Sequence, residues 1–186
     1  MSLRASVSAD ATLRLFYGLP LPAGVGDALG RWQASELLGD GPTRPVATGQ
    51  LHVTLAFLGA RPRGELAALR RVLAEAAAGA ERPVLTVRRY RETDRVAMLV
   101  LDDEGGAAGR LQARLSAMLE RLGAYRPERR PWLAHVTVAR FGERPRLRPA
   151  LPRLEPFSPS DAALYHSVLR PDGAQYSILE AVSLGG

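Results

Sequence analysis

The sequence predicts an α+β fold, and three observations lead to that class. Segments that read as strands outnumber segments with helical periodicity, and successive strands favour hairpins over a regular strand–helix–strand series. The 186 residues suit one domain with a sizeable core. A twelve-residue segment also occurs twice, which indicates an internal duplication. We therefore expect a bilobal fold with pseudo-twofold symmetry, in which two mainly antiparallel sheets are flanked by helices and border a central cleft.

Two regions are expected along the chain. Residues 1–11 form a short segment with three serines, Arg4 and Asp10, which predicts a flexible N-terminal lead-in. Residues 12–186 predict a single domain of two lobes, each carrying one copy of the repeated segment.

Helices are expected where apolar residues recur at intervals of three and four. The first helix covers 25–38, with Val25, Leu29, Trp32 and Leu37 at this spacing, and a Gly-Asp-Gly-Pro break follows at 39–42. A turn at 61–64 leads into the second helix, which runs to about residue 78 with Leu66, Leu69, Leu73 and Ala76 inward. The third helix covers 107–122, with Leu111, Leu115, Met118 and Leu122 on one face.

Strands are expected where residues with high β-propensity lie between turn signals. The expected strands are 12–19, 51–58, 83–90, 95–101 and 134–139, followed by two closing strands that end near residue 184. A basic loop at 126–131 precedes the fifth strand, and a proline-rich connector at 145–159 precedes the closing pair.

The repeated segment is the most informative feature of the sequence. HVTLAFLGARPR at 52–63 returns as HVTVARFGERPR at 135–146, with eight of the twelve residues identical at a constant offset of 83. The chain has three histidines, and two of them, His52 and His135, open the two copies. Each is followed two residues later by a threonine, Thr54 or Thr137. A repeat that served packing alone would keep its apolar positions, so the retained polar pair favours one site built from both copies.

The spacing of each pair suits the binding of an anion. Residues i and i+2 of a strand point to the same side, so His52 and Thr54 share a face, as do His135 and Thr137. The two side chains of a copy stand about 6.6 Å apart along the strand, a reach that suits two oxygens of one tetrahedral anion. A single His-x-Thr is usually an ordinary strand sequence, but two copies with shared flanking residues are hard to attribute to chance.

These motifs carry a resemblance to a known family. The paired His-x-Thr strands resemble the 2H phosphoesterase superfamily, and within it the bacterial and archaeal RNA 2′,3′-cyclic phosphodiesterases, also labelled 2′-5′ RNA ligases. The segments at 51–59 and 135–141 resemble the two family signatures. The segments at 14–20, 164–169 and 173–176 are similar to the opening strand and final hairpin, so the resemblance covers most of the chain.

The resemblance implies a phosphoric diester hydrolase of RNA processing, with tRNA among its expected substrates. Water would open an RNA 2′,3′-cyclic phosphate end to leave a 2′-phosphate. In-line displacement needs an acid and a base on opposite sides of the phosphorus, and two histidines near pKa 6.5 can divide these catalytic roles. We take His52 as the acid and His135 as the base, although a symmetric sequence does not distinguish them. Thr54, Thr137 and Arg140 are expected to bind the phosphate.

The two copies differ at the fifth position after the histidine, where Phe57 stands in one and Arg140 in the other. Strict alternation turns both away from the histidine face, which predicts a core phenylalanine and a surface arginine. A bulge near the following glycine would re-aim both side chains. The resemblance suggests that these positions flank the terminal base, and we favour this base-stacking role for Phe57 and Arg140.

Composition bears on partners and cofactors. The formal net charge is +6, and all 25 basic residues are arginine, which favours a polyanionic partner such as RNA. The absence of cysteine excludes thiolate chemistry. The acidic run at 102–104 is interpreted as helix capping, and His-x-Thr is not a compact ligand set, so we expect no metal. No Walker loop or dinucleotide fingerprint is present, so we expect no cofactor. No signal peptide or long apolar run is present, so we expect a cytoplasmic protein without membrane contact.

Other interpretations remain open at this stage. The same site could act on small cyclic nucleotides or carry out 2′-5′ RNA ligation, and a non-catalytic module could bind RNA ends. The sequence does not specify the physiological RNA, the base preference or the oligomeric state, for which a monomer is expected. His166 is interpreted as an ordinary strand histidine, Trp32 as core, and Trp132 as core with a ligand-contacting alternative.

Overall fold

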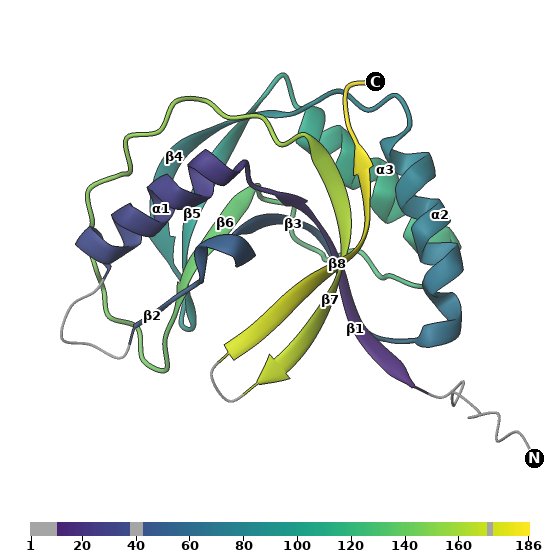
Figure 1. Cartoon of the computed structure of the whole chain (residues 1–186), viewed down its shortest axis with the longest axis horizontal. Helices are drawn as coiled ribbons and strands as arrows, with labels where there is room; N and C mark the ends of the chain where they lie inside the picture. The colour runs from purple at the N-terminus through teal and green to yellow at the C-terminus, as the bar shows by residue number, and fades with distance from the viewer. Residues whose placement is uncertain (1–10, 38–42, 171–172) are drawn as a thin grey trace, which may run out of the picture.

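The computed structural model of the protein describes residues 11–37, 43–170 and 173–186 (Figure 1). The predicted lead-in lies outside the described residues except for residue 11, and the predicted break at 39–42 lies outside them entirely. The helices are α1 (Ala23–Glu36), α2 (Leu66–Ala77) and α3 (Ala107–Arg121), with short 3-10 helices at Thr48–Gln50 and Arg63–Glu65. The strands are β1 (Thr12–Pro20), β2 (Arg44–Pro45), β3 (His52–Pro62), β4 (Val84–Glu92), β5 (Val96–Glu104), β6 (His135–Arg140), β7 (Asp161–Arg170) and β8 (Gly173–Ser183).

All described strands belong to one antiparallel sheet, which confirms the predicted α+β class. The order is β4-β5-β6-β3-β1-β7-β8, with β2 paired to β6 at the side. The expectation of two sheets is wrong, because the pairing of β3 with β6 joins the two halves into one sheet. The join is narrow: Val53↔Val136 is the single β3–β6 residue pair recorded among the described residues. The sheet is accordingly strongly curled (Figure 1).

The pair at the join connects equivalent positions of the repeat. Val53 directly follows His52, and Val136 directly follows His135, at the same offset of 83 residues. Antiparallel pairing centred on these valines sets each histidine beside the threonine of the other copy along the strand direction. A twofold relation therefore holds locally at the join, whereas the duplication of the whole fold stays a prediction.

Helix α1 lies apart from α2 and α3 in the fold (Figure 1). Helix α1 lies over β4, β5 and β6, where the amide of Gln33 donates to the carbonyl oxygens of Val46 at 2.9 Å and Val138 at 2.6 Å. The Trp32 indole is buried and donates to the Ala150 carbonyl at 2.7 Å, which confirms its core placement. Helices α2 and α3 pack on each other, with α2 against β7 and β8 and α3 against β3 and β5.

Most predicted elements are confirmed, with two instructive differences. Strand β3 continues to Pro62, so the turn predicted at 61–64 begins later than expected. Helix α3 ends at Arg121, and Leu122 is 45% exposed, whereas Leu119 is fully buried in its place. The difference arises because Leu122 is the C-cap residue and lies beyond the last helical turn, so it does not reach the buried face that Leu111, Leu115 and Leu119 share.

The acidic run at 102–104 has the capping role that the sequence predicts. The carboxylate of Asp103 accepts the backbone N–H groups of Ala108 at 3.1 Å and Gly109 at 2.8 Å, at the start of α3. These are donors that a helix cannot satisfy internally. None of the described helices combines the length and apolar character that a membrane crossing requires.

Candidate active site

Each motif strand contains a β-bulge at the third residue after its histidine. In β3, Thr54 pairs with Gly18 and Ala56 with Tyr17, so Leu55 is the extra residue. In β6, the pairings Met98↔Thr137 and Ala97↔Ala139 leave Val138 as the extra residue. Leu55 and Val138 occupy the same position of the repeat, 83 residues apart. A bulge interrupts alternation, so the residues beyond it point the other way.

The paired bulges turn Phe57 and Arg140 toward the histidine side of the strands. Phe57 is 47% exposed and lines a cavity together with His52 and Thr54. A core phenylalanine, the expectation from strict alternation, is therefore wrong because the bulge precedes it. Arg140 lines the same cavity from the second motif strand.

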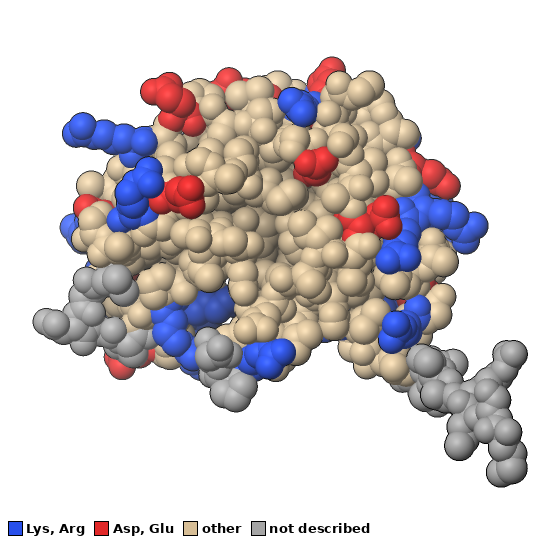
Figure 2. Space-filling model, in the orientation of Figure 1, with Lys and Arg blue, Asp and Glu red and all other residues tan. Residues whose placement is uncertain are grey.

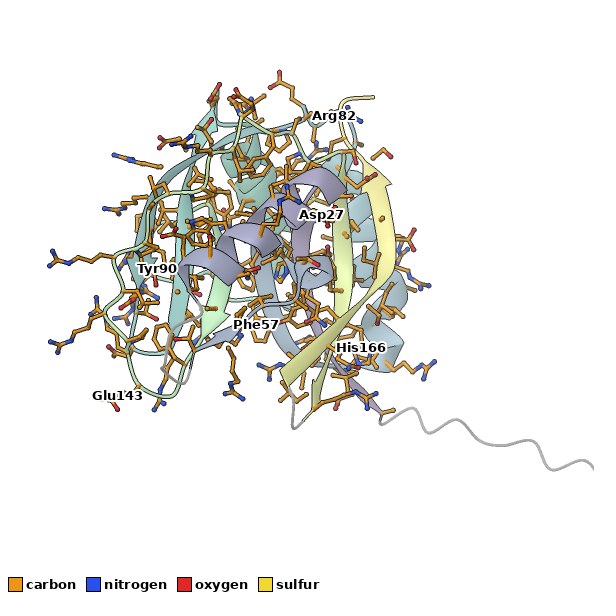
Figure 3. All side chains as sticks on the ribbon, turned by 60° about the vertical axis from the view of Figure 1, so that its left-hand side comes forward. Asp27, Phe57, Arg82, Tyr90, Glu143 and His166 are labelled. Atoms are coloured by element: carbon orange, nitrogen blue, oxygen red, sulfur yellow. The ribbon has the colours of Figure 1, made fainter. Side chains whose placement is uncertain are left out.

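Five of the six predicted site residues line one cavity of about 360 Å³, namely His52, Thr54, Phe57, Thr137 and Arg140. The sixth, His135, lines an adjoining cavity of about 510 Å³ that shares Thr54 and Phe57 with the first. Residues far apart in the sequence are thus brought together at the junction of β3 and β6. Phe57 is labelled in this central region in Figure 3.

Backbone carbonyls orient both imidazoles in the same way. The Nδ1 of His52 lies 2.8 Å from the carbonyl oxygen of Gln50, and that of His135 lies 2.8 Å from the carbonyl oxygen of Leu133. A carbonyl oxygen only accepts, so Nδ1 carries the hydrogen in both rings and Nε2 is left for chemistry. The Nε2 of His52 lies 3.1 Å from the Thr54 hydroxyl, which donates to it when the ring is neutral.

Aromatic side chains surround His52. Its ring centroid lies 4.7 Å from that of Phe16, 5.5 Å from that of Tyr165 and 5.3 Å from that of Tyr176. Burial lowers the pKa of His52 to about 4, and electrostatic repulsion from His135 and Arg140 acts in the same direction, against the Gln50 hydrogen bond. The ring is therefore neutral at pH 7.

Gly18 of β1 makes room for this imidazole. A Cβ placed at Gly18 would lie 2.9 Å from the carbonyl oxygen of Val53 and 3.2 Å from Cδ2 of His52. Contacts this short force a neighbour to move, and the backbone at Val53 is held by the join between the two halves of the sheet. The glycine is thus tied to the position of the histidine ring.

Sequence reasoning missed three arginines that line the catalytic cavity, namely Arg14, Arg44 and Arg170. Arg14 of β1 places its guanidinium carbon 4.8 Å from the centre of the Phe57 ring, a cation–π contact. Arg44 of β2 lines the same cavity as Arg140. In Figure 2, basic side chains gather around a hollow near the lower edge, in the region of β2 and the β7–β8 hairpin. Arg14 could have been found from its i, i+2 relation to Phe16, whereas a two-residue strand leaves no such signal for Arg44.

Two other singled-out residues behave differently from the six. His166 lies on β7 and is not among the residues that line either cavity (Figure 3). Trp132 is half-buried, donates its indole N–H to the Thr54 carbonyl at 3.0 Å and lines the His135 cavity, so it contacts both core and site. Across the ranges that the structure describes, no three His, Asp or Glu side chains cluster closely enough to hold a metal ion.

Comparisons with known proteins agree with this geometry. A profile described as the 2′-5′ RNA ligase superfamily matches residues 22–169. The chain is 35% identical to the RNA 2′,3′-cyclic phosphodiesterase of Thermus thermophilus, over 94% of this chain and 91% of the relative. A crystal structure from the same organism superposes with a TM-score of 0.80 and 32% identity, covering 92% and 98% of the two chains. Escherichia coli LigT complexed with NADP⁺ superposes with a TM-score of 0.77 and 26% identity, covering 94% and 99%.

Proposed function

The chain belongs to the 2′-5′ RNA ligase superfamily of 2H phosphoesterases, and from that premise we propose that it hydrolyses RNA 2′,3′-cyclic phosphate ends to 2′-phosphate ends without a metal ion. One observation carries this proposal. Two imidazoles with the same tautomer stand on strands joined at Val53↔Val136, beside a cavity that basic and hydroxyl side chains line. The name of the Thermus relative supports the choice of substrate.

The reaction needs one base and one acid. The base removes a proton from water as its oxygen bonds to phosphorus, and the bond from phosphorus to the 3′-oxygen breaks. The acid gives its proton to that oxygen, which leaves a 3′-hydroxyl and a 2′-phosphate monoester. Attack and departure lie roughly in line, so the two groups stand on opposite sides of the phosphorus.

The environment of His52 bears on how these roles divide. Its ring is neutral at pH 7 because burial holds its pKa near 4, and its Nε2 lone pair can accept a proton. We therefore assign His52 as the base and His135 as the acid, which reverses the assignment made from sequence. After turnover the two histidines exchange the proton with solvent and return to their starting states.

Hydroxyl and guanidinium groups complete the phosphate site. Thr54 and Thr137 present hydroxyls to the cavity, and Arg140 with Arg44 supplies positive charge near the non-bridging oxygens. Donors held in place before the reaction stabilise charge that develops on these oxygens. Arg140 therefore acts on the phosphate in this proposal and flanks the base.

Phe57 is proposed to stack on the terminal base. Its ring is half-exposed at the cavity, and Arg14 covers part of it, so a base would use the area that Arg14 leaves open. Stacking is worth about 1–3 kcal/mol per base and accepts any base. This tolerance suits an enzyme that acts at an end rather than at a sequence.

Small cyclic nucleotides are the second candidate substrates. The cavity of about 360 Å³ has the size expected for a small-molecule site, and LigT was crystallised with the small dinucleotide NADP⁺. A direct comparison separates the two candidates. We expect a higher kcat/KM for an RNA of about ten nucleotides with a cyclic end than for the nucleoside 2′,3′-cyclic phosphate. Equal or lower values for the RNA would make the small nucleotide the substrate.

The regiochemistry of the product tests the proposal itself. Phosphorus NMR of the product of a nucleoside 2′,3′-cyclic phosphate distinguishes a 2′-phosphate from a 3′-phosphate. The proposal requires the 2′-phosphate and a free 3′-hydroxyl. A 3′-phosphate, or no product with either the nucleotide or the RNA, would refute it.

A further inference from the structure

A second basic groove lies outside the catalytic cavity. It has a volume of about 760 Å³ and runs between the edge strand β4 and the strap formed by residues 144–148. Its lining includes five arginines, Arg89 and Arg91 from β4 and Arg144, Arg146 and Arg148 from the strap. Tyr90 and Glu143, which mark β4 and the loop beside the strap, lie on the same side of the molecule in Figure 3.

Glu92 is the one carboxylate in this lining, and the strap already uses it. The carboxylate is 8% exposed and accepts four hydrogen bonds. The donors are the Tyr90 hydroxyl at 2.9 Å, the Arg144 Nε at 3.1 Å and the backbone N–H groups of Arg146 at 3.0 Å and Leu147 at 2.7 Å. Its charge is therefore committed to Arg144 and to the backbone.

The other four arginines keep their charge available. Arg89, Arg91, Arg146 and Arg148 are exposed, and no carboxylate of the described residues lies within ion-pair distance of their guanidinium groups. Like charges gathered on one surface repel one another, so they favour the binding of a polyanion that releases its counterions.

One arginine is shared between the groove and the catalytic region. Arg91 lines both the groove and the cavity that contains His135, and that cavity shares Thr54 and Phe57 with the catalytic cavity. We propose that the groove binds the phosphate backbone of the single-stranded RNA that leads to the reacting end. This inference rests on the proposed function, because it extends the substrate from the terminal nucleotide to the strand behind it.

Two features favour a single strand over a duplex. Trp132 and Tyr125 line the cavity that contains His135, where unpaired bases can stack on aromatic rings. Arg89 and Arg91 are two residues apart on a strand, about 6.6 Å, a spacing comparable with that of successive phosphates in an extended chain. The arginines of β4 have an alternative role, because charged residues on an edge strand discourage pairing with another sheet. If this were their only role, their removal would leave the affinity for RNA unchanged.

A double variant separates the two roles. Arg89→Ala/Arg148→Ala removes two exposed guanidinium groups, and Arg71→Ala/Arg121→Ala, on α2 and α3, is the matched control. Fluorescence anisotropy would measure the affinity for a single-stranded RNA of about ten nucleotides that ends in an ordinary 3′-hydroxyl. Turnover of a nucleoside 2′,3′-cyclic phosphate would be measured in parallel.

The groove variant should bind the RNA about tenfold more weakly at low salt. The slope of log affinity against log salt should fall by about 1.4, since each phosphate contact contributes about 0.7 for a single strand. Mononucleotide turnover should stay unchanged, and the control variant should match the native protein in both measurements.

Unchanged RNA affinity would overturn the inference, and so would an equal loss of mononucleotide turnover, which would indicate a structural role. The proposed function can fail separately. If the native protein turns over no cyclic phosphate but the groove variant still loses RNA affinity, RNA binding by the groove is supported and the proposed hydrolytic activity is refuted.

Discussion

Hydrogen bonding at the two histidines determines which ring nitrogen can act. In both rings Nδ1 donates to the backbone carbonyl of the residue two positions earlier, so proton transfer must pass through Nε2. We expect His52→Ala and His135→Ala each to lower kcat for a cyclic phosphate by about 10²–10⁴-fold, the usual contribution of a general acid or base. Initial-rate assays and circular dichroism would establish the loss in folded protein.

His166→Ala is the control for this prediction. It removes the third histidine, whose own side chain lines neither cavity, so its rate should be nearly native. A folded His52 or His135 variant with near-native turnover would rule out the two-histidine mechanism.

The buried position of His52 also predicts a pH dependence. The kcat/KM profile reports groups of the free enzyme, and the base works only when neutral. Because the pKa of His52 is lowered to about 4, the acidic limb should fall near pH 4, well below the value of about 6.5 for an ordinary histidine. An acidic limb at pH 6 to 7 in folded protein would contradict the assignment of His52 as base.

Stability should follow the same group. The unfolded chain takes up a proton at His52 near pH 6.5, whereas the folded protein does so only near pH 4. The unfolded state therefore binds more protons in this window, so the free energy of unfolding should decrease as the pH falls from 6.5 to 4. In His52→Ala this contribution disappears, which thermal melts across the window can measure.

At the scale of elements, the bulges in β3 and β6 decide which side chains reach the site. Phe57→Ala removes a half-exposed ring, so it should weaken RNA binding by about 1–3 kcal/mol and change stability little. Leu55→Ala, at the buried bulge position two residues earlier, should instead destabilise the fold by about 2–5 kcal/mol. Isothermal titration calorimetry would measure the RNA affinity of both variants, and thermal melting curves would measure their stability.

The reverse pattern would return Phe57 to a packing role. That outcome is a Phe57→Ala variant that melts markedly lower but binds cyclic-ended RNA normally. Arg140→Ala, the equivalent position in β6, should lower turnover in a correctly folded protein, because it removes charge beside the phosphate.

The strands and helices could be predicted because their periodicity is local. The bulges were harder to locate, since strict alternation was expected through Leu55 and Val138 and a possible bulge was placed only near the following glycines, Gly59 and Gly142. In retrospect the apolar pairs Leu55-Ala56 and Val138-Ala139, at the same place in both copies, are the signal that alternation fails there. The stripe on α3 failed only at its C-terminal end, because the helix ends at Arg121 and Leu122 is its C-cap residue, so Leu119 is the last leucine of the buried face.

At the scale of the whole molecule, the repeat predicted the composition of the site but not how its halves meet. The single pair Val53↔Val136 joins residues 83 positions apart, and no local pattern encodes such a contact. Arg14 and Arg44 reach the cavity because β1 pairs with β3 and β2 pairs with β6. Their place at the site therefore follows from the sheet topology. The His-x-Thr pairs could be predicted from the sequence, because the duplication repeats both the histidine and the threonine.

Turnover of a 2′,3′-cyclic-ended RNA in the presence of EDTA tests the central claim of metal-free catalysis by two histidines. The native protein should convert the cyclic end to a 2′-phosphate at its full rate in chelator, and His52→Ala and His135→Ala should each lose that activity. Loss of native activity in EDTA with recovery on addition of a divalent ion would contradict the account.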